Sequence, residues 1–234
     1  MKLFHQFQHL LLELLKEYTG KEVENADCSD PVVLEQLRQA DTLAVPEFDS
    51  DFVRRTINEA RPQSFDDLVK IMGLSHGTDV WLDNGEILTL EGKALSQLAT
   101  VRDDVFLHLT DCGVDRKNAF KIAEIVRRGR LSLENDVNCG CIKIMKEAGV
   151  EDWYIESIKK IRYMFPKAHA VSYVMNAVRC AWFKRNYPAE YYAAYLTCFF
   201  GNKKEMNEDE KWQYDEVIEE CRARGIELLP PDKK

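Results

Sequence analysis

One segment begins with residue types that could bind the phosphates and the base of a nucleotide. It reads YMFPKAHAVSYVMNAVRC, with Pro166 at an expected helix start, followed by Lys167, His169 and Tyr173. Free backbone N–H groups and the positive end of the helix dipole favour an anion at a helix N-terminus. This arrangement suggests a triphosphate and base platform. A core helix whose basic residues are merely solvated would show the same pattern.

The segment GLSHGTDVW, residues 73–81, is a second candidate for ligand binding and is expected to belong to a loop over residues 74–84. Its glycines would allow the Ser75 hydroxyl, the His76 imidazole and exposed backbone N–H groups to converge on a ligand. The Ser-His pair is weak evidence for a hydrolase, because adjacent side chains rarely hold nucleophile-to-base geometry and no orienting acid is implied. The segment therefore favours binding over hydrolysis.

Paired carboxylates are the candidate Mg²⁺ ligands, because two metal ions in phosphoryl transfer need oxygen atoms close together. Asp49 and Asp51 form a short D-x-D pattern, and adjacent aspartates occur at 66–67 and 103–104. All of them fall where a helix N-cap or first turn is predicted, which accounts for them without a metal. The Cys-Gly-Cys sequence at 139–141 lacks the second ligand pair that a zinc site needs. We predict no metal site in this chain.

Basic residues are concentrated in two stretches of a chain whose formal net charge is −8. Residues 116–130 contain six basic groups and one acid, and residues 159–185 contain seven basic groups and no acid. Residues 1–115 contain 22 acids and only 10 bases. The uneven distribution fits an electrostatic footprint for phosphate, and it equally fits bases that pair with acids across helix interfaces.

The periodicity of apolar residues predicts an all-α fold. Apolar residues recur at intervals of three and four, and alternating runs of β-branched residues are missing. A hydrophobic content of 45% is enough for a sizeable core. Periodicity and capping residues place helices over these ranges: 3–18, 31–40, from a cap at 49 or 50 to 60, 64–73, 102–111, 115–128, 134–148, 152–164, 167–186, 189–199 and 208–224.

Composition also predicts the compartment. The longest apolar run, residues 191–200, is about half of the 18 to 20 residues that a membrane span needs. The seven cysteines are scattered and odd in number, which favours reduced thiols. The N-terminus enters an amphipathic segment without a small-residue cleavage site. We therefore predict a cytoplasmic protein without a membrane partner.

Four stretches carry a family pattern: PEFDSDFVRR, GLSHGTDVW, RDDVFLHLTDCGVDRKNAFKIAEIVRRGR and DWYIESIKKIRYMFPKAHAVSYVMNAVRCAWFKRNYPAEYYAAYLT. Together they resemble the fingers region of bacterial C-family replicative DNA polymerases, most closely the Gram-positive PolC-type alpha subunit of DNA polymerase III. The resemblance runs from about residue 18 to 196. It implies a helical fingers domain over residues 1–200, with 1–47 as a lead-in from the palm and 48–200 as the core. Residues 201–234 resemble the start of a following helical module.

The same resemblance implies that the chain binds an incoming deoxynucleoside triphosphate and primer-template DNA. It assigns the nucleotide to six residues: Ser75, His76, Arg102, Lys167, His169 and Tyr173. Arg102 and Lys167 would contact its phosphates, whereas the two aromatic residues of the later segment, at 169 and 173, would line the nascent base pair. The DNA backbone would lie against Lys121, Arg127 and Arg128, and Arg130 of the same basic run is predicted to bind DNA with them.

The resemblance also has a gap. The family holds its catalytic metals with palm aspartates that all precede the stretch represented here, and the D-x-D pattern at 49–51 aligns with a position that is not catalytic. The chain therefore resembles a polymerase fragment that is inactive alone and binds no cofactor by itself, with Mg²⁺ and the nucleotide acting in the complete polymerase. A palm in cis or in trans would be a partner. Two alternatives stay open: a stand-alone nucleic-acid or nucleotide-binding module, and a helical protein-interaction domain that pairs with a separately encoded palm.

Overall fold

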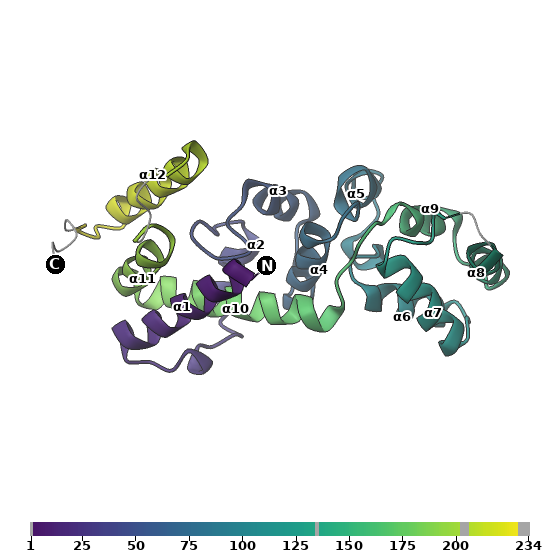
Figure 1. Cartoon of the computed structure of the whole chain (residues 1–234), viewed down its shortest axis with the longest axis horizontal. Coiled ribbons are helices and arrows are strands. Elements are labelled where there is room, and N and C mark those ends of the chain that lie inside the picture. The colour runs from purple at the N-terminus through teal and green to yellow at the C-terminus, as the bar shows by residue number, and fades with distance from the viewer. Residues whose placement is uncertain (1, 134–135, 202–205, 229–234) are drawn as a thin grey trace. The chain divides into compact units, whose positions relative to one another are not determined.

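The computed structural model describes residues 2–133, 136–201 and 206–228, and these residues form helices and their connections (Figure 1). The α-helices are α1 (Lys2–Thr19), α2 (Pro31–Arg38), α3 (Asp51–Ala60), α4 (Phe65–His76), α5 (Glu86–Leu90), α6 (Arg102–Asp111), α7 (Arg116–Arg127), α8 (Asp136–Glu147), α9 (Asp152–Lys160), α10 (Lys167–Asn186), α11 (Pro188–Phe200) and α12 (Glu208–Ala223). Three short turns lie between them: η1 (Val23–Asn25), η2 (Trp81–Gly85) and η3 (Leu95–Gln97). No strand occurs in the described ranges, so the predicted all-α fold is confirmed.

The chain divides into two compact units. The first comprises residues 1–35, 42–49 and 176–234, and the second comprises residues 36–41 and 50–175. Helix α10 contributes its first half to the second unit and its second half to the first. The predicted domain boundary near residue 200 stays a prediction. None of the helices in the described ranges is long and apolar enough to cross a lipid bilayer.

The first unit is held together by aromatic packing and one buried ion pair. Helix α1 packs against α11, where the Phe7 ring meets Phe199 edge to face at 4.2 Å between centroids. Lys184 on α10 is buried, donates a hydrogen bond to the Leu43 carbonyl (2.6 Å) and lies 3.0 Å from Glu220 on α12. A buried charge is tolerated only with partners of this kind, so this lysine fixes α12 on the unit.

The second unit contains a helical hairpin in which α6 packs along α7 (Figure 1). Asp115 begins α7 as its N-cap, since its carboxylate accepts the N–H groups of Lys117 and Asn118, both at 3.1 Å. Gly113 and Gly129 follow the two helices with positive φ, as the sequence predicts for helix C-termini. The hairpin carries the basic run of residues 116–130.

Helix α4 is longer than predicted. It begins at the expected cap, Ser64, but continues through Gly73 to His76, so the predicted loop over 74–84 is wrong for its first three residues. Gly73 is required for packing and not for a turn, because a Cβ there would meet the carbonyl oxygen of Thr100. The rest of that predicted loop contains η2, after which α5 begins, a helix that periodicity did not reveal.

Helix α9 is shorter than predicted, ending at Lys160 and not at Met164. The backbone groups that follow bond to other parts of the second unit, which a helix would have prevented. The extended segment that results, residues 161–166, joins α9 to α10 and is called the connector below.

The N-cap of α4 offers a direct test of local stability. Ser64 Oγ accepts the N–H of Asp67 at 3.1 Å, and the Asp67 carboxylate accepts the N–H of Gln63 at 2.9 Å. We expect Ser64→Ala to lower the free energy of unfolding by about 1 kcal/mol, because one N-terminal N–H loses its partner. Urea unfolding followed by circular dichroism measures the change, and Ser64→Asp, which keeps a capping oxygen, should restore most of it. Equal stability of the alanine variant would show that the cap contributes nothing.

Candidate functional site

The connector brings three helices of the second unit to one place. Thr78, two residues after α4, donates its N–H to the Tyr163 carbonyl (2.8 Å) and accepts the N–H of Arg162 (3.0 Å). This isolated bridge joins positions 85 residues apart in sequence. It sets the end of α4, with Ser75 and His76, beside the residues that precede α10.

The connector also bonds to both helices of the hairpin. The Met164 N–H donates to the Arg127 carbonyl at the end of α7 (3.3 Å), and the Arg102 N–H at the start of α6 donates to the Phe165 carbonyl (2.9 Å). Since every one of these bonds joins main-chain atoms, the frame does not depend on the side chains that project from it. Predicted site residues of α4, α6, α7 and α10 therefore converge on one short segment.

An aromatic cluster lies on this frame. Phe165 is its centre, with ring centroids at 5.6 Å from His76, 5.2 Å from His169 and 5.9 Å from Tyr173. The rings of His76 and Tyr173 are stacked at 6.0 Å. Three predicted residues thus come together, and Phe165 is a fourth that sequence reasoning missed, although it lies in the YMFPKAHA motif. Flat ring faces of this kind are typical of surfaces that receive a nucleobase.

Ser75 and His76 occupy the last turn of α4 and not a loop. Ser75 Oγ lies 2.9 Å from His76 Nδ1 and donates to the Met72 carbonyl at 3.3 Å. The expectation that such neighbours rarely reach hydrogen-bond geometry is wrong for this pair, because consecutive residues of this last helical turn bring the two atoms together. The imidazole is nevertheless packed among the aromatic rings, an environment suited to positioning a base.

The N-terminus of α10 already holds a carboxylate. Asp103 on α6 accepts the Lys167 N–H at 2.7 Å, and its other oxygen accepts a bond from Arg102 at 3.0 Å. Lys167 Nζ lies 2.6 Å from Asp66 on α4, and this bond raises the pKa of Lys167 above its ordinary value. The N-terminus of α10 and the Lys167 ammonium therefore each have a carboxylate partner, and the binding of a nucleotide phosphate at this place stays a prediction. In this structure the negative groups come from the protein itself.

Three arginines share one carboxylate beside this site. Glu124 on α7 accepts bonds from Arg102 (3.3 Å), Arg127 (3.1 Å) and Arg128 (3.2 Å). The hydrogen bond from Arg127 is the principal cause that lowers the pKa of Glu124 below its ordinary value. We call these four residues the arginine cluster. The arginine cluster links Arg102, which is predicted to contact nucleotide phosphates, to Arg127 and Arg128, which are predicted to contact DNA.

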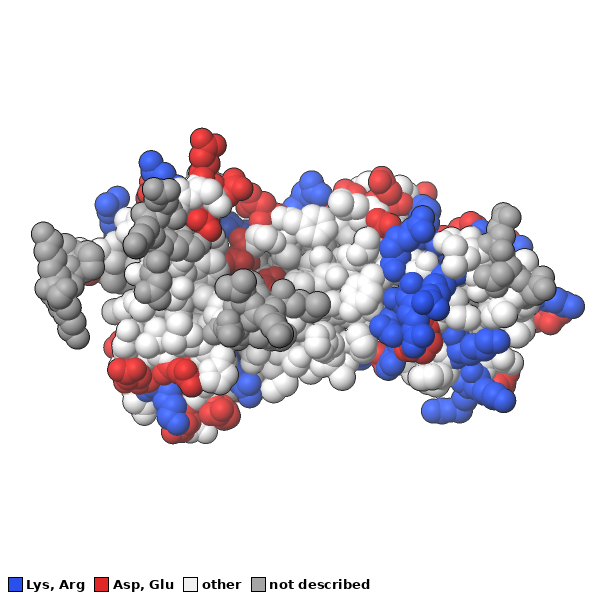
Figure 2. All heavy atoms as spheres, in the orientation of Figure 1, with Lys and Arg blue, Asp and Glu red and all other residues white. Residues whose placement is uncertain are grey.

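The remaining predicted DNA contacts lie on either side of the cluster. Lys121 is exposed one turn before Glu124 on α7, and Arg130 is exposed just after Gly129. Figure 2 shows Lys and Arg side chains gathered over the region of α6, α7 and the connector. The basic run of α7 thus forms part of a positively charged face of the second unit.

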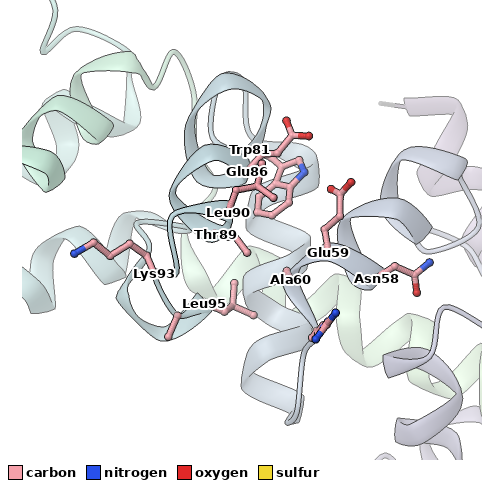
Figure 3. A pocket seen from close by; sticks show the side chains of 11 residues that line it. Asn58, Glu59, Ala60, Trp81, Glu86, Thr89, Leu90, Lys93 and Leu95 are labelled. Atoms are coloured by element: carbon pink, nitrogen blue, oxygen red, sulfur yellow. The ribbon is translucent and has the colours of Figure 1, made fainter.

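A pocket of about 580 Å³ lies elsewhere in the second unit, between the end of α3 and the segment from η2 to η3 (Figure 3). Its lining residues are Asn58, Glu59, Ala60, Arg61, Trp81, Glu86, Thr89, Leu90, Lys93, Ala94 and Leu95. None of the predicted binding residues lines it. Its Lys93 ammonium lies 4.2 Å from the Trp153 ring centroid, a cation–π contact. The residues predicted to bind phosphate therefore lie on the basic face and not in this pocket.

Asp49 and Asp104, two of the carboxylates considered as metal ligands, have structural partners. Asp49 accepts bonds from Tyr195 (3.2 Å) and Gln213 (3.3 Å) within the first unit. Asp104 accepts the N–H and hydroxyl of Thr100 and lies 3.2 Å from Lys70. Across the described part of the chain, no three His, Cys, Asp or Glu side chains come close enough together to hold a metal ion.

Comparison with known proteins identifies the family. The model of the bacterial DNA polymerase III alpha subunit finger domain matches residues 7–131. The chain is 45% identical over 197 residues to a DNA polymerase III PolC-type of Caldanaerobacter subterraneus, covering 82% of this chain and 14% of that protein. It is 41% identical over 203 residues to the PolC-type polymerase of Ureaplasma parvum, covering 80% of this chain and again 14% of the relative. The chain therefore spans about one seventh of the length of these relatives, and it belongs to the finger domain family of bacterial PolC-type DNA polymerase III alpha subunits.

Proposed function

We propose that the second unit binds an incoming deoxynucleoside triphosphate together with primer-template DNA during template-directed DNA synthesis. Lys167 and Arg102 contact the phosphates of the nucleotide. The aromatic cluster of His76, Phe165, His169 and Tyr173 contacts the nascent base pair, and the exposed basic side chains of α7 lie along the DNA backbone. The observation that carries the proposal is the convergence of these groups on the connector, from four helices that are distant in sequence.

The contribution of this chain to the reaction is positioning and charge neutralisation. Oriented cations stabilise the negative charge of a triphosphate without having to reorganise at the moment of reaction. Mg²⁺ would arrive with the nucleotide and be held by carboxylates from another part of the polymerase, since the described residues offer no cluster of three ligands. We therefore propose that this chain acts with a palm and does not extend a primer alone.

The carboxylates at the site would be exchanged for phosphate oxygens when the nucleotide binds. Asp66 and Lys167 are 56% and 39% exposed, so their ion pair contributes little to folding and is easily replaced. A triphosphate offers more negative charge and more acceptor oxygens than one carboxylate, which favours the exchange. The bound aspartates keep the cations oriented in the meantime.

Titration of labelled primer-template into the purified chain, with and without the complementary nucleotide and Mg²⁺, tests this function. We expect the correct nucleotide to tighten DNA binding, and Lys167→Ala to reduce that tightening by about tenfold because one charge-assisted contact is lost. Lys159→Ala is the matched control: it removes the same charge from the same basic stretch, at a side chain that pairs with Glu156 and lies outside the site. Equal effects of the two variants would contradict a specific role for Lys167.

A second function is supported by the ion pairs themselves. Four basic side chains contact acids of the same unit: Lys167, Arg102, Arg127 and Arg128. This is expected for a helical protein-interaction module whose basic side chains only stabilise packing. The two functions differ in whether these lysine and arginine side chains also bind DNA. Charge reversal on α7 distinguishes the two functions.

A further inference from the structure

We propose that Glu124 is a positioning residue that holds the three arginines of its cluster as one phosphate-binding group. The inference rests on the proposed function, because it assigns Glu124 a role in binding DNA and nucleotide. It also makes an unusual claim about an acid on a basic face: removal of this negative charge should weaken the binding of a negatively charged ligand.

The geometry places the carboxylate at the centre of the cluster. Both oxygens of Glu124 are used: Oε1 accepts from Arg102 Nη1 and Arg127 Nε, and Oε2 accepts from Arg127 Nη2 and Arg128 Nη2, all between 3.1 and 3.3 Å. The side chain is only 20% exposed, whereas that of Arg128 is 54% exposed. Arg102 and Arg127 are 27% and 23% exposed, close to Glu124, so these three side chains are half-buried together and Arg128 is the most exposed member of the cluster.

Electrostatics explains why a single acid is needed there. Three guanidinium groups bonded to one carboxylate lie within a few ångströms of one another, so without it they would repel and move apart. Glu124 is also the only acid in the run from 116 to 130. A guanidinium has five N–H donors, so each arginine keeps donors that Glu124 does not use, and those of the more exposed Arg128 are the most accessible to phosphate oxygens.

Positioning also reduces the entropy lost on binding. A free arginine side chain loses rotamer entropy when a ligand fixes it in one conformation. Arginines already fixed on Glu124 have lost much of this freedom before the ligand arrives, which is the general benefit of preorganisation. The carboxylate further links Arg102 on α6 to Arg127 and Arg128 on α7, so the proposed nucleotide and DNA contacts are oriented together.

The decisive variant is Glu124→Gln, which preserves the shape and removes the charge. Its matched control is Glu147→Gln on α8, an exposed glutamate that pairs with Lys143 away from the cluster. Both variants raise the net charge by one. We expect duplex binding by Glu124→Gln to weaken about five- to tenfold, since bonds to a charged partner are lost, and the salt dependence of binding to become shallower. Binding by Glu147→Gln should be unchanged or slightly tighter.

A double-mutant cycle separates positioning from a general effect on folding. If Glu124 acts through the arginines, Glu124→Gln should weaken duplex binding clearly less in the Arg128→Ala background than in the unmodified chain. A fold-wide disturbance would give the same further loss in both backgrounds, and that result would overturn the proposal.

Three further outcomes are informative. Glu124→Gln that binds as tightly as the unmodified chain, or more tightly, overturns the inference and leaves the proposed function in place. An unmodified chain without salt-dependent duplex binding overturns the proposed function and this inference with it. If the glutamine variant loses the circular dichroism signal of its helices, its binding cannot be interpreted, and NMR of the unmodified chain tests the inference instead. The Nε–H signal of Arg127 should then be protected from solvent exchange, whereas exchange as fast as that of exposed Arg55 would overturn the inference.

Discussion

Reversal of charge at Arg127 and Arg128 together, both to glutamate, is expected to weaken primer-template binding by about a hundredfold or more at moderate salt. Each arginine that contacts a phosphate contributes to counterion release, so the loss of two makes the negative slope of log K against log salt shallower by about two. The new glutamates would in addition repel the DNA backbone. Fluorescence anisotropy with labelled primer-template at several salt concentrations measures both the affinity and the slope.

The control for this experiment lies on α8. Lys143 and Lys146 are exposed and pair with nearby acids, Glu147 and Asp152. Reversal of both changes the net charge by the same amount without touching the arginine cluster, so its effect on binding should be much smaller. Arg127→Ala with Arg128→Ala guards against disturbance of Glu124 by introduced acids. Full DNA binding by the reversed variant would favour the protein-interaction module over the polymerase function.

Gly129→Ala is expected to destabilise the second unit strongly, and much more than Gly149→Ala does. Gly129 has φ of +65°, and a Cβ there would also meet the backbone of Arg162 in the connector. Backbone strain and the forced separation of two main chains together should cost about 3 kcal/mol or more. Because Gly129 ends α7 directly after Arg127 and Arg128, the variant should also bind DNA less well. Urea unfolding gives the stability, and duplex titration gives the binding.

Gly149→Ala separates the two causes. Gly149 has a similar φ of +76°, but a Cβ there would have nothing within 4 Å. Gly149→Ala should therefore lower the free energy of unfolding by about 1 kcal/mol, because alanine is strained in the left-handed conformation. The difference between the two losses of unfolding free energy measures the contribution of the close contact between the end of α7 and the connector. Equal costs would show that this approach is not important for stability.

Most helices could be predicted because their signals are local. The N-caps at Ser50, Ser64 and Asp115, and the positive-φ glycines after α6 and α7, all operate within a few residues of the helix ends. Gly73 misled the prediction because its reason is not local: it allows α4 to approach Thr100, which is 27 residues away. Nothing in a single sequence distinguishes such a glycine from one that ends a helix.

The candidate site was predictable in its parts but not in its arrangement. The YMFPKAHA motif and the basic run of α7 identify Lys167, His169, Tyr173 and the arginines as candidates, and the charge distribution supports them. The sequence gives no sign that Asp103 binds the N-terminus of α10 or that Glu124 joins three arginines. Pairings of this kind depend on which helix faces meet in space, and residues 64 apart, such as Asp103 and Lys167, carry no common local signal.

The connector has a consequence for how this family can change over evolutionary time. Its hydrogen bonds to Thr78, Arg127 and Arg102 are all made by main-chain atoms. The exposed side chains of the connector, Arg162 and Tyr163, can therefore be replaced without loss of these bonds, whereas Ile161 and Met164 are buried in the core and are constrained by packing. Insertions, deletions and a proline at Arg162 or Met164 are different, because each would remove a donor or break the register of the bonds. Substitutions should thus accumulate at the exposed positions of this segment while its length and its two buried apolar positions stay constant.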